Sequence, residues 1–308
     1  MRNYFSYIFA MLFAALSLNA NNTPKPNCNI NHVVITVKSL EKAVKNYRKS
    51  GFNVVETGQF GTNFVHNAHI PFITGSYIEL FSPVNPDSFK QFQKLRIAGK
   101  LAQRLTKANI MNKRFLTHLS YKTGVSDFAL ETNKNISIEK LVAKLQKHGV
   151  KYSGPISMKR ITPAKKVMHW IVYVPETTAL PFLIHWINND DIPKSIAEQK
   201  KLGIKGIKNV TVAVKNFKMR IEQYSILLGV KPEIVSSNKL PDTNIALFKL
   251  NNESITLISP KNPKSPAFSF LKEKKPSPYS ITLECTKKTD IPLKLLDDAK
   301  ISTFYLQQ

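Results

Sequence analysis

The sequence predicts an α+β protein built from repeated units, each made of one strand, one helix and three further strands. A strand pattern followed by a helix pattern occurs three times, at residues 30–50, 125–147 and 207–228. Each of these helices ends at a glycine, a residue that favours helix C-termini; the glycines are Gly51, Gly149 and Gly229. In addition, residues 76–83 (SYIELFSP) and 253–260 (ESITLISP) share one frame, which supports the repeat.

The first unit begins with a strand at residues 30–37 (INHVVITV). Ser39 belongs to the residue types that cap helix N-termini, and it precedes a helix over residues 40–50 with an apolar stripe at helical spacing. Three strands then complete a βαβββ unit, at residues 52–57, 64–73 and 76–82.

The last of these strands carries an unusual face. Alternate residues of a strand point to the same side, so Glu79 lies between Tyr77 and Phe81, while Ile78 and Leu80 point to the other side. An acidic side chain between two aromatic ones indicates either the lining of a site or a solvent-exposed face.

An insertion at residues 84–124 separates the first unit from the second. Within it, residues 87–108 predict a basic amphipathic helix, which packs over the sheet or binds a membrane or a partner. The second unit has a strand at 125–132 and a helix capped by Ser137. It ends with three strands, at residues 150–156, 167–174 and 180–187.

A polar, charged segment at residues 189–204 is the predicted linker between two domains. The first domain is expected at residues 21–188 and the second at residues 205–308. The second holds a third βαβββ unit and a fourth, starting at residues 279–285, that lacks its last two strands. We therefore expect one complete pair of units and a second, truncated pair.

The N-terminus has the features of a secretory signal peptide at residues 1–20. A positive start precedes an apolar run at residues 4–18, and Ala20 provides a small residue at the cleavage point. The run is short for a transmembrane helix. We expect an exported protein, periplasmic or secreted, with no membrane span after cleavage; an uncleaved membrane anchor is the alternative.

The formal net charge is +25, from 45 lysine and arginine residues against 20 acidic ones. The positive residues are mainly lysines spread along the chain, so we expect no specific nucleic-acid binding. A solvated lysine-rich surface, or loose attachment to anionic surfaces, accounts for the charge. Cys28 and Cys285 are the two cysteines, and both their pairing and the oligomeric state stay open at this point.

Several motifs in order resemble the vicinal oxygen chelate superfamily, and within it the glyoxalase-like domain proteins. These motifs are HVVITV, the HNA-containing strand, YIEL and LPFLIHW. The resemblance is good over about residues 30–188 and weak over residues 205–308. It implies that two βαβββ modules pair into one half-open sheet that cups a site, with metal ligands on the first and fourth strands of each module.

The resemblance implies a ligand set for a divalent metal such as Fe, Mn, Ni or Zn. Alignment of the first strands places His32 opposite Asp127, and alignment of the fourth strands places Glu79 opposite His185. Glu79 is the candidate catalytic residue, as a proton shuttle. A polar pocket without a metal, in which His32, Asp127 and Glu79 hydrogen-bond to one another, is the alternative.

The expected contacts to a small-molecule ligand are Tyr77, Phe81 and His66. His66 is expected to line the cup and His69 to face away from it; a structural role for His66 is the alternative. In the second pair the corresponding residues are Asn209, Thr256 and Ser280, none of them a ligand of the predicted type. The site is therefore expected in the first domain.

Two functions are compatible with these residues. The first is a metal-dependent lyase, isomerase or dioxygenase of glyoxalase-like type, acting on a small molecule with vicinal oxygens. The alternative is a non-catalytic protein of the same fold that binds or sequesters a small molecule.

Overall fold

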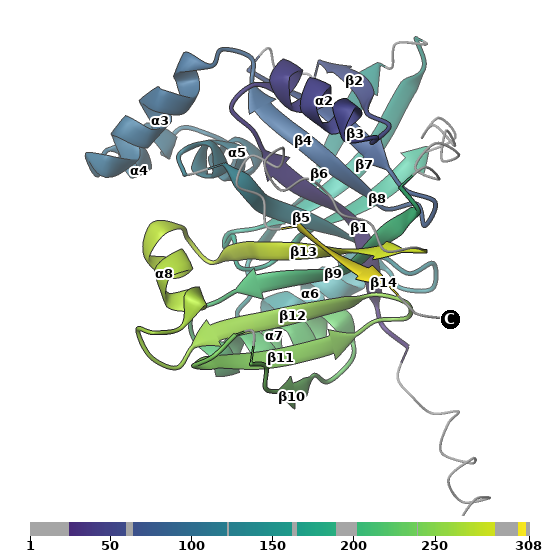
Figure 1. The fold of residues 1–308 in the computed structure, drawn as a ribbon, viewed down its shortest axis with the longest axis vertical. Coiled ribbons are helices and arrows are strands. Elements are labelled where there is room, and N and C mark those ends of the chain that lie inside the picture. The colour runs from purple at the N-terminus through teal and green to yellow at the C-terminus, as the bar shows by residue number, and fades with distance from the viewer. Residues whose placement is uncertain are drawn as a thin grey trace, which may run out of the picture.

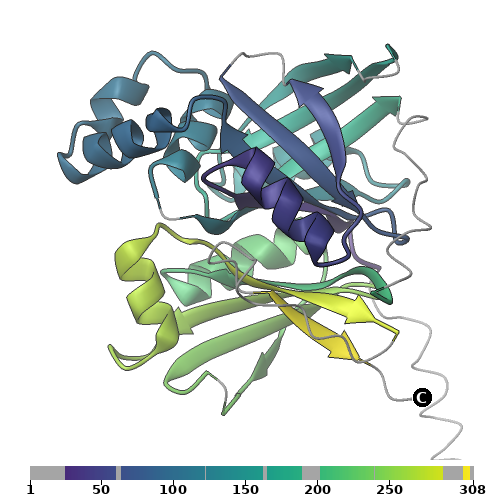
Figure 2. The ribbon, with the colours of Figure 1, turned by 45° about the horizontal axis from the view of Figure 1, so that its top comes forward.

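The computed structural model describes residues 25–59, 64–121, 123–161, 165–188, 202–238, 240–286 and 301–305. These residues form two β-sheets with helices beside them, and the smaller sheet lies below the larger one in both views (Figure 1, Figure 2). The expected signal peptide and most of the expected linker lie outside the described residues. Within the described ranges, no helix is long and apolar enough to cross a membrane.

The larger sheet contains both modules of the first domain, in the strand order β2-β3-β4-β1-β5-β8-β7-β6. Its strands are β1 (Cys28–Thr36), β2 (Val55–Gln59), β3 (Val65–Pro71), β4 (Tyr77–Pro83), β5 (Gly124–Thr132), β6 (Tyr152–Ile161), β7 (Val167–Pro175) and β8 (Phe182–Asn188). The central pair β1 and β5 is antiparallel, and each pairs in parallel with the fourth strand of its own module, β4 or β8. The predicted α+β fold of paired βαβββ modules is confirmed.

One helix per module covers the outer face of this sheet. Helix α2 (Leu40–Lys49) is capped by Ser39, whose hydroxyl accepts a hydrogen bond from the Lys42 amide, and α6 (Ile138–Lys147) is capped in the same way by Ser137. Both predicted caps are thus present. The apolar stripes of α2 and α6 are buried in one cluster with Ile78 and Leu80 of β4.

The insertion forms three short helices rather than the single helix expected over residues 87–108. They are α3 (Asp87–Ile97), α4 (Leu101–Leu105) and α5 (Ile110–Leu119). The break after α3 includes Gly99, whose φ of +69° suits a residue without a Cβ atom. Phe89, Phe92 and Leu101 pack on Phe81 and other side chains of the larger sheet, so the insertion covers the pocket face of that sheet.

The second domain forms a six-stranded sheet in the order β10-β11-β12-β9-β13-β14. Its elements are β9 (Ile204–Ala213), α7 (Phe217–Leu228), β10 (Glu233–Val235), β11 (Thr243–Lys249), β12 (Ser254–Pro260), α8 (Pro266–Glu273), β13 (Ser277–Cys285) and β14 (Ile301–Tyr305). The third βαβββ unit is complete, and β13 begins the fourth.

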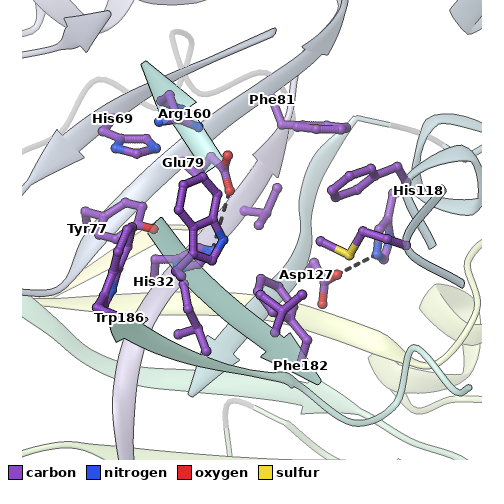
Figure 3. Close-up of a pocket in the computed structure, with 16 residues that line it drawn as sticks. His32, His69, Tyr77, Glu79, Phe81, His118, Asp127, Arg160, Phe182 and Trp186 are labelled. Carbon is purple, nitrogen blue, oxygen red and sulfur yellow. Dashed lines mark hydrogen bonds and ion pairs between the residues drawn. The ribbon is translucent and has the colours of Figure 1, made fainter. Parts of the chain in front are cut away.

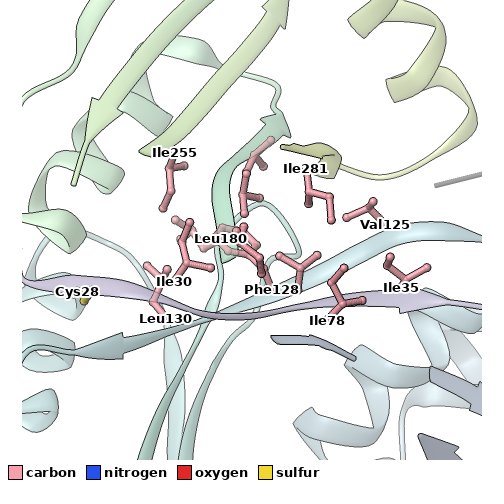
Figure 4. Close-up of a cluster of buried hydrophobic side chains, with 14 of the residues drawn as sticks. Cys28, Ile30, Ile35, Ile78, Val125, Phe128, Leu130, Leu180, Ile255 and Ile281 are labelled. Atoms are coloured by element: carbon pink, nitrogen blue, oxygen red, sulfur yellow. The ribbon is translucent and has the colours of Figure 1, made fainter. Parts of the chain in front are cut away.

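The two sheets share one hydrophobic core. Phe128 and Leu180 of the first domain lie in the same cluster of buried side chains as Ile255 and Ile281 of the second (Figure 4). Such a continuous apolar interface resembles the interior of a single domain more than a transient contact between two. Both cysteines are buried free thiols in this cluster, and burial raises the pKa of Cys28 to about 12.

Candidate functional site

The face of the larger sheet opposite α2 and α6 forms a pocket, closed on one side by α5 (Figure 3). Its cavity is narrow, with a volume of about 40 Å³, and it opens to solvent at a mouth. Six of the sixteen lining residues have large aromatic side chains: Tyr77, Phe81, Phe115, Trp170, Phe182 and Trp186. Tyr77, Glu79 and Phe81 therefore share the pocket face, as strand alternation predicts.

A histidine–carboxylate pair lies at the centre of this pocket. His32 Nε2 is 3.5 Å from Glu79 Oε2, and the His32 side chain is only 4% exposed. Tyr77 stacks on the His32 ring at 4.5 Å between centroids, and the Phe182 ring meets it edge-on at 5.3 Å. Asn67 Nδ2 also donates to Glu79 Oε1. The Glu79 carboxylate is therefore held by two partners, and the His32 ring is packed between aromatic rings.

Glu79 and His69, which lie opposite each other in the pocket, both have strongly lowered pKa values. Burial by itself raises the pKa of Glu79, but the hydrogen bond and charge of His32, together with His69 and the Asn67 hydrogen bond, outweigh burial and lower this pKa to about 2. Burial, together with the nearby charge of Arg160, lowers the pKa of His69 to about 3. At neutral pH the Glu79 carboxylate is thus ionised and the His69 imidazole is neutral.

Replacement of Glu79 by glutamine is expected to flatten the acid limb of the stability curve. A carboxyl group with a lowered folded-state pKa stabilises the fold above its unfolded pKa, and this contribution is lost as the pH falls through the folded pKa. For Glu79 the window runs from about 4.5 down to about 2. Urea unfolding across this window should show a loss of up to about 1.4 kcal/mol per pH unit that the E79Q protein lacks.

The control for this titration is E56Q, because Glu56 also pairs with a basic side chain but is 66% exposed. The E56Q protein is expected to follow the wild type. Parallel curves for E79Q and wild type would contradict the assignment of an ionised, stabilising Glu79.

Asp127 lines the same pocket, but its carboxylate is bonded to the inserted helix α5. Arg114 donates from Nε and Nη2 to the two oxygens at 2.6 Å each, and His118 Nε2 lies 2.8 Å from Oδ2. Arg114 is itself buried and donates further to the Leu180 carbonyl. The Asp127 carboxylate is therefore engaged in a buried ion pair that fastens α5 to β5. The sequence analysis did not identify Arg114 or His118 as its partners.

The structure does not bring His185 to the pocket. On β8 the pocket-facing residues are Phe182, Ile184 and Trp186. His185 is exposed on the opposite face, where its charge acts on Glu139 of α6. The expectation that His185 lies with His32 and Glu79 is corrected accordingly, because alternate residues of one strand face opposite ways.

The register identifies the residue that is equivalent to Glu79. Glu79 lies opposite Val34, two residues after His32. In the second module, Phe182 lies opposite Ala129, two residues after Asp127. Phe182 therefore occupies the fourth position of the expected ligand set. His185 lies three residues further along β8, and because this number is odd its side chain points to the opposite face of the sheet.

The two histidines of β3 exchange their expected roles. His69 lies directly opposite Glu79 and lines the pocket, whereas His66 lies opposite Ser82 and is absent from the lining. Residues directly opposite each other in an antiparallel pair share a face. The position of His69 opposite Glu79 in the hairpin of β3 and β4 therefore indicates that His69 lies in the cup. Arg160 of β6 also lines the pocket, over the Trp170 ring at 5.7 Å, and nothing local in the sequence marked it.

The donor set does not fit a divalent metal. In the part of the chain that the structure describes, no group of three or more His, Cys, Asp or Glu side chains is arranged to hold an ion. His32 and Glu79 converge, but Asp127 is neutralised by Arg114 and the fourth position is Phe182. Zinc sites use three or four such ligands. Of the four expected ligands only His32 and Glu79 converge, and His69 lines the pocket beside them.

The paired modules and the central cup define a protein of the vicinal oxygen chelate superfamily. The chain belongs to the glyoxalase-like domain family, whose family model matches residues 30–228. No curated protein matches the sequence.

The solved structures to which this chain is similar are distant in sequence. A hypothetical protein from Staphylococcus aureus is 18% identical, with 91% of this chain and 100% of that chain covered and a TM-score of 0.61. A triple mutant of 4-hydroxymandelate synthase from Streptomyces coelicolor is 11% identical, with 85% of this chain and 72% of that chain covered and a TM-score of 0.50. A Mn(II)-bound glyoxalase from Novosphingobium aromaticivorans is 9% identical, with 86% and 68% covered and a TM-score of 0.47.

Proposed function

We propose that this protein binds a small planar molecule in the pocket of Figure 3 without a resident metal ion. The observation that carries the proposal is the combination of an aromatic lining with an altered ligand set, in which Phe182 and the Arg114–Asp127 pair occupy two of the four positions. A mainly apolar cavity with a few convergent polar groups is typical of small-molecule sites. This is the second of the two functions that the sequence left open.

The polar groups of the pocket favour a ligand with hydroxyl groups on a flat ring. Glu79 is ionised and accepts hydrogen bonds, and hydrogen bonds to a charged acceptor are the stronger kind. The surrounding rings supply flat surfaces for stacking. A molecule with two adjacent ring hydroxyls, of which catechol is the simplest, satisfies both features.

A second candidate is proton transfer, as in a lyase or isomerase. It is favoured by the His32–Glu79 pair, because two titratable groups 3.5 Å apart inside a pocket can move a proton between a bound molecule and the protein. In this reaction Glu79 keeps the role expected of it from the sequence, as the proton-carrying carboxylate.

Tryptophan fluorescence tests the binding proposal directly. The chain has two tryptophans, Trp170 and Trp186, and both line the pocket with their ring centroids 5.2 Å apart. In protein treated with EDTA, catechol is expected to change the fluorescence saturably and to bind about tenfold more tightly than toluene. The difference corresponds to about 1.4 kcal/mol for the hydrogen bond to Glu79, and E79Q should reduce it, because a glutamine oxygen still accepts but carries no charge.

Addition of Mn(II) is expected to leave the affinity for catechol unchanged. Binding that appears only with Mn(II), or a metal that stays bound stoichiometrically through purification, would overturn the metal-free proposal. Equal affinities of the wild type and E79Q for catechol would remove Glu79 from the ligand contacts.

A further inference from the structure

Strand β1 contains a β-bulge directly before His32. Ile30 lies opposite Leu130 of β5, and His32 lies opposite Ala129, so β1 advances two residues where β5 advances one. Asn31 is the extra residue. Bulges re-aim side chains and occur next to functional sites, and this one adjoins the pocket pair.

The bulge brings the side chains of two consecutive residues together. In a regular strand Asn31 and His32 would point to opposite faces, but here Asn31 Oδ1 lies 2.7 Å from His32 Nδ1. Asn31 Nδ2 donates to Glu131 Oε2 at 3.0 Å. Asn31 and His32 are 6% and 3% exposed, so the contact between them is shielded from water.

The hydrogen-bonding capacities of these groups determine where the ring proton sits. The Glu131 carboxylate accepts hydrogen bonds, so the NH₂ end of the Asn31 amide faces it. The amide oxygen then faces His32, and because that oxygen can only accept, Nδ1 of the ring must carry a proton. When the ring is protonated, Nε2–H faces the Glu79 carboxylate, which also only accepts. In the neutral ring the proton on Nε2 is the one that is lost, because Nδ1 lies 2.7 Å from the Asn31 oxygen whereas Nε2 lies 3.5 Å from Glu79.

We infer that Asn31, oriented by Glu131, is a positioning residue that holds His32 in the Nδ1–H tautomer and directs Nε2 into the pocket. The inference deepens the proposed function, because it identifies the ring nitrogen that meets a bound molecule or exchanges a proton with it. The outer end of this chain of contacts borders the second domain: Asn31 and Glu131 line a polar cleft together with Asn251 and Glu253 of that domain.

Nitrogen NMR of the full chain labelled with ¹⁵N-histidine tests the inference without any ligand. The protein has seven histidines, and the His32 signals are those missing from the H32Q protein. At a pH where the ring is neutral, the wild type is expected to show a protonated Nδ1 and an unprotonated Nε2. In N31A the proton is expected to shift to Nε2, where the Glu79 carboxylate can accept it.

N29A is the matched control, since Asn29 also lies at this end of β1 and bonds to Asn133 rather than to the His32 ring. Its His32 signals should match the wild type, whereas E131Q should give a mixture of both tautomers because a glutamine no longer orients the Asn31 amide. A wild-type ring protonated at Nε2, or an unchanged tautomer in N31A, would overturn the inference. Failure of catechol to bind a protein with the Nδ1–H tautomer would overturn the proposed function alone.

Discussion

Replacement of Asp127 by asparagine is expected to lower the free energy of unfolding by about 3–5 kcal/mol, the usual cost of breaking a buried ion pair from one side. Asparagine keeps the size of the side chain but leaves the Arg114 guanidinium and His118 without their charged acceptor. The side chains of Arg114 and Asp127 are each 3% exposed, so water cannot replace the lost contact. Urea unfolding followed by circular dichroism measures the change.

The pH dependence of the Asp127 contribution has a defined sign. Burial raises the pKa of Asp127, but the charges of Arg114 and His118 outweigh burial and hold that pKa well below its usual range. The ion pair therefore stabilises the fold at neutral pH, and its contribution declines as the pH falls below about 3.9, the unfolded-state value. The difference between wild type and D127N should shrink in acid.

E233Q provides the control. Glu233 pairs with Lys249 at 2.6 Å, the same distance as in the buried pair, but its side chain is 55% exposed. Exposed pairs contribute about 0–1 kcal/mol, so a small loss in E233Q beside a large one in D127N would show that burial makes the difference. A loss below about 1 kcal/mol in D127N would contradict the structural role assigned to this carboxylate.

Replacement of Phe128 by alanine is expected to destabilise both domains together, by about 3–5 kcal/mol. Phe128 is fully buried on β5, in the cluster that also holds Ile255 and Ile281 of the second domain. Two probes test the coupling: fluorescence reports on Trp170 and Trp186 of the first domain, and circular dichroism reports on the whole chain. The two unfolding transitions should coincide and shift together.

F268A is the matched control, because Phe268 of α8 is 40% exposed and loses little burial on truncation. A circular dichroism transition that splits in F128A, with one part unmoved from the wild-type midpoint, would show that the second domain is stable without the shared core.

Local regularities in the sequence determined the helix of each module and the pocket face of β4. Ser39 and Ser137 mark the starts of α2 and α6, because each hydroxyl accepts a hydrogen bond from an amide three residues further along the chain. The apolar stripes of the two helices follow from helical spacing alone. The alternation of Tyr77, Glu79 and Phe81 set the face of β4 for the same reason. These features depend only on residues a few positions apart, so one sequence suffices to predict them.

The composition of the site depended on long-range register, which only the tertiary structure supplies. His185 and Phe182 differ by three positions on one strand, and the pairing of β8 with β5 decided which of them meets His32. Arg114 reaches Asp127 from an inserted helix whose path no repeat predicts. The bulge at Asn31 adds a residue to β1 relative to β5. The sequence of β1 alone does not predict this bulge, because the register depends on how β1 pairs with β5.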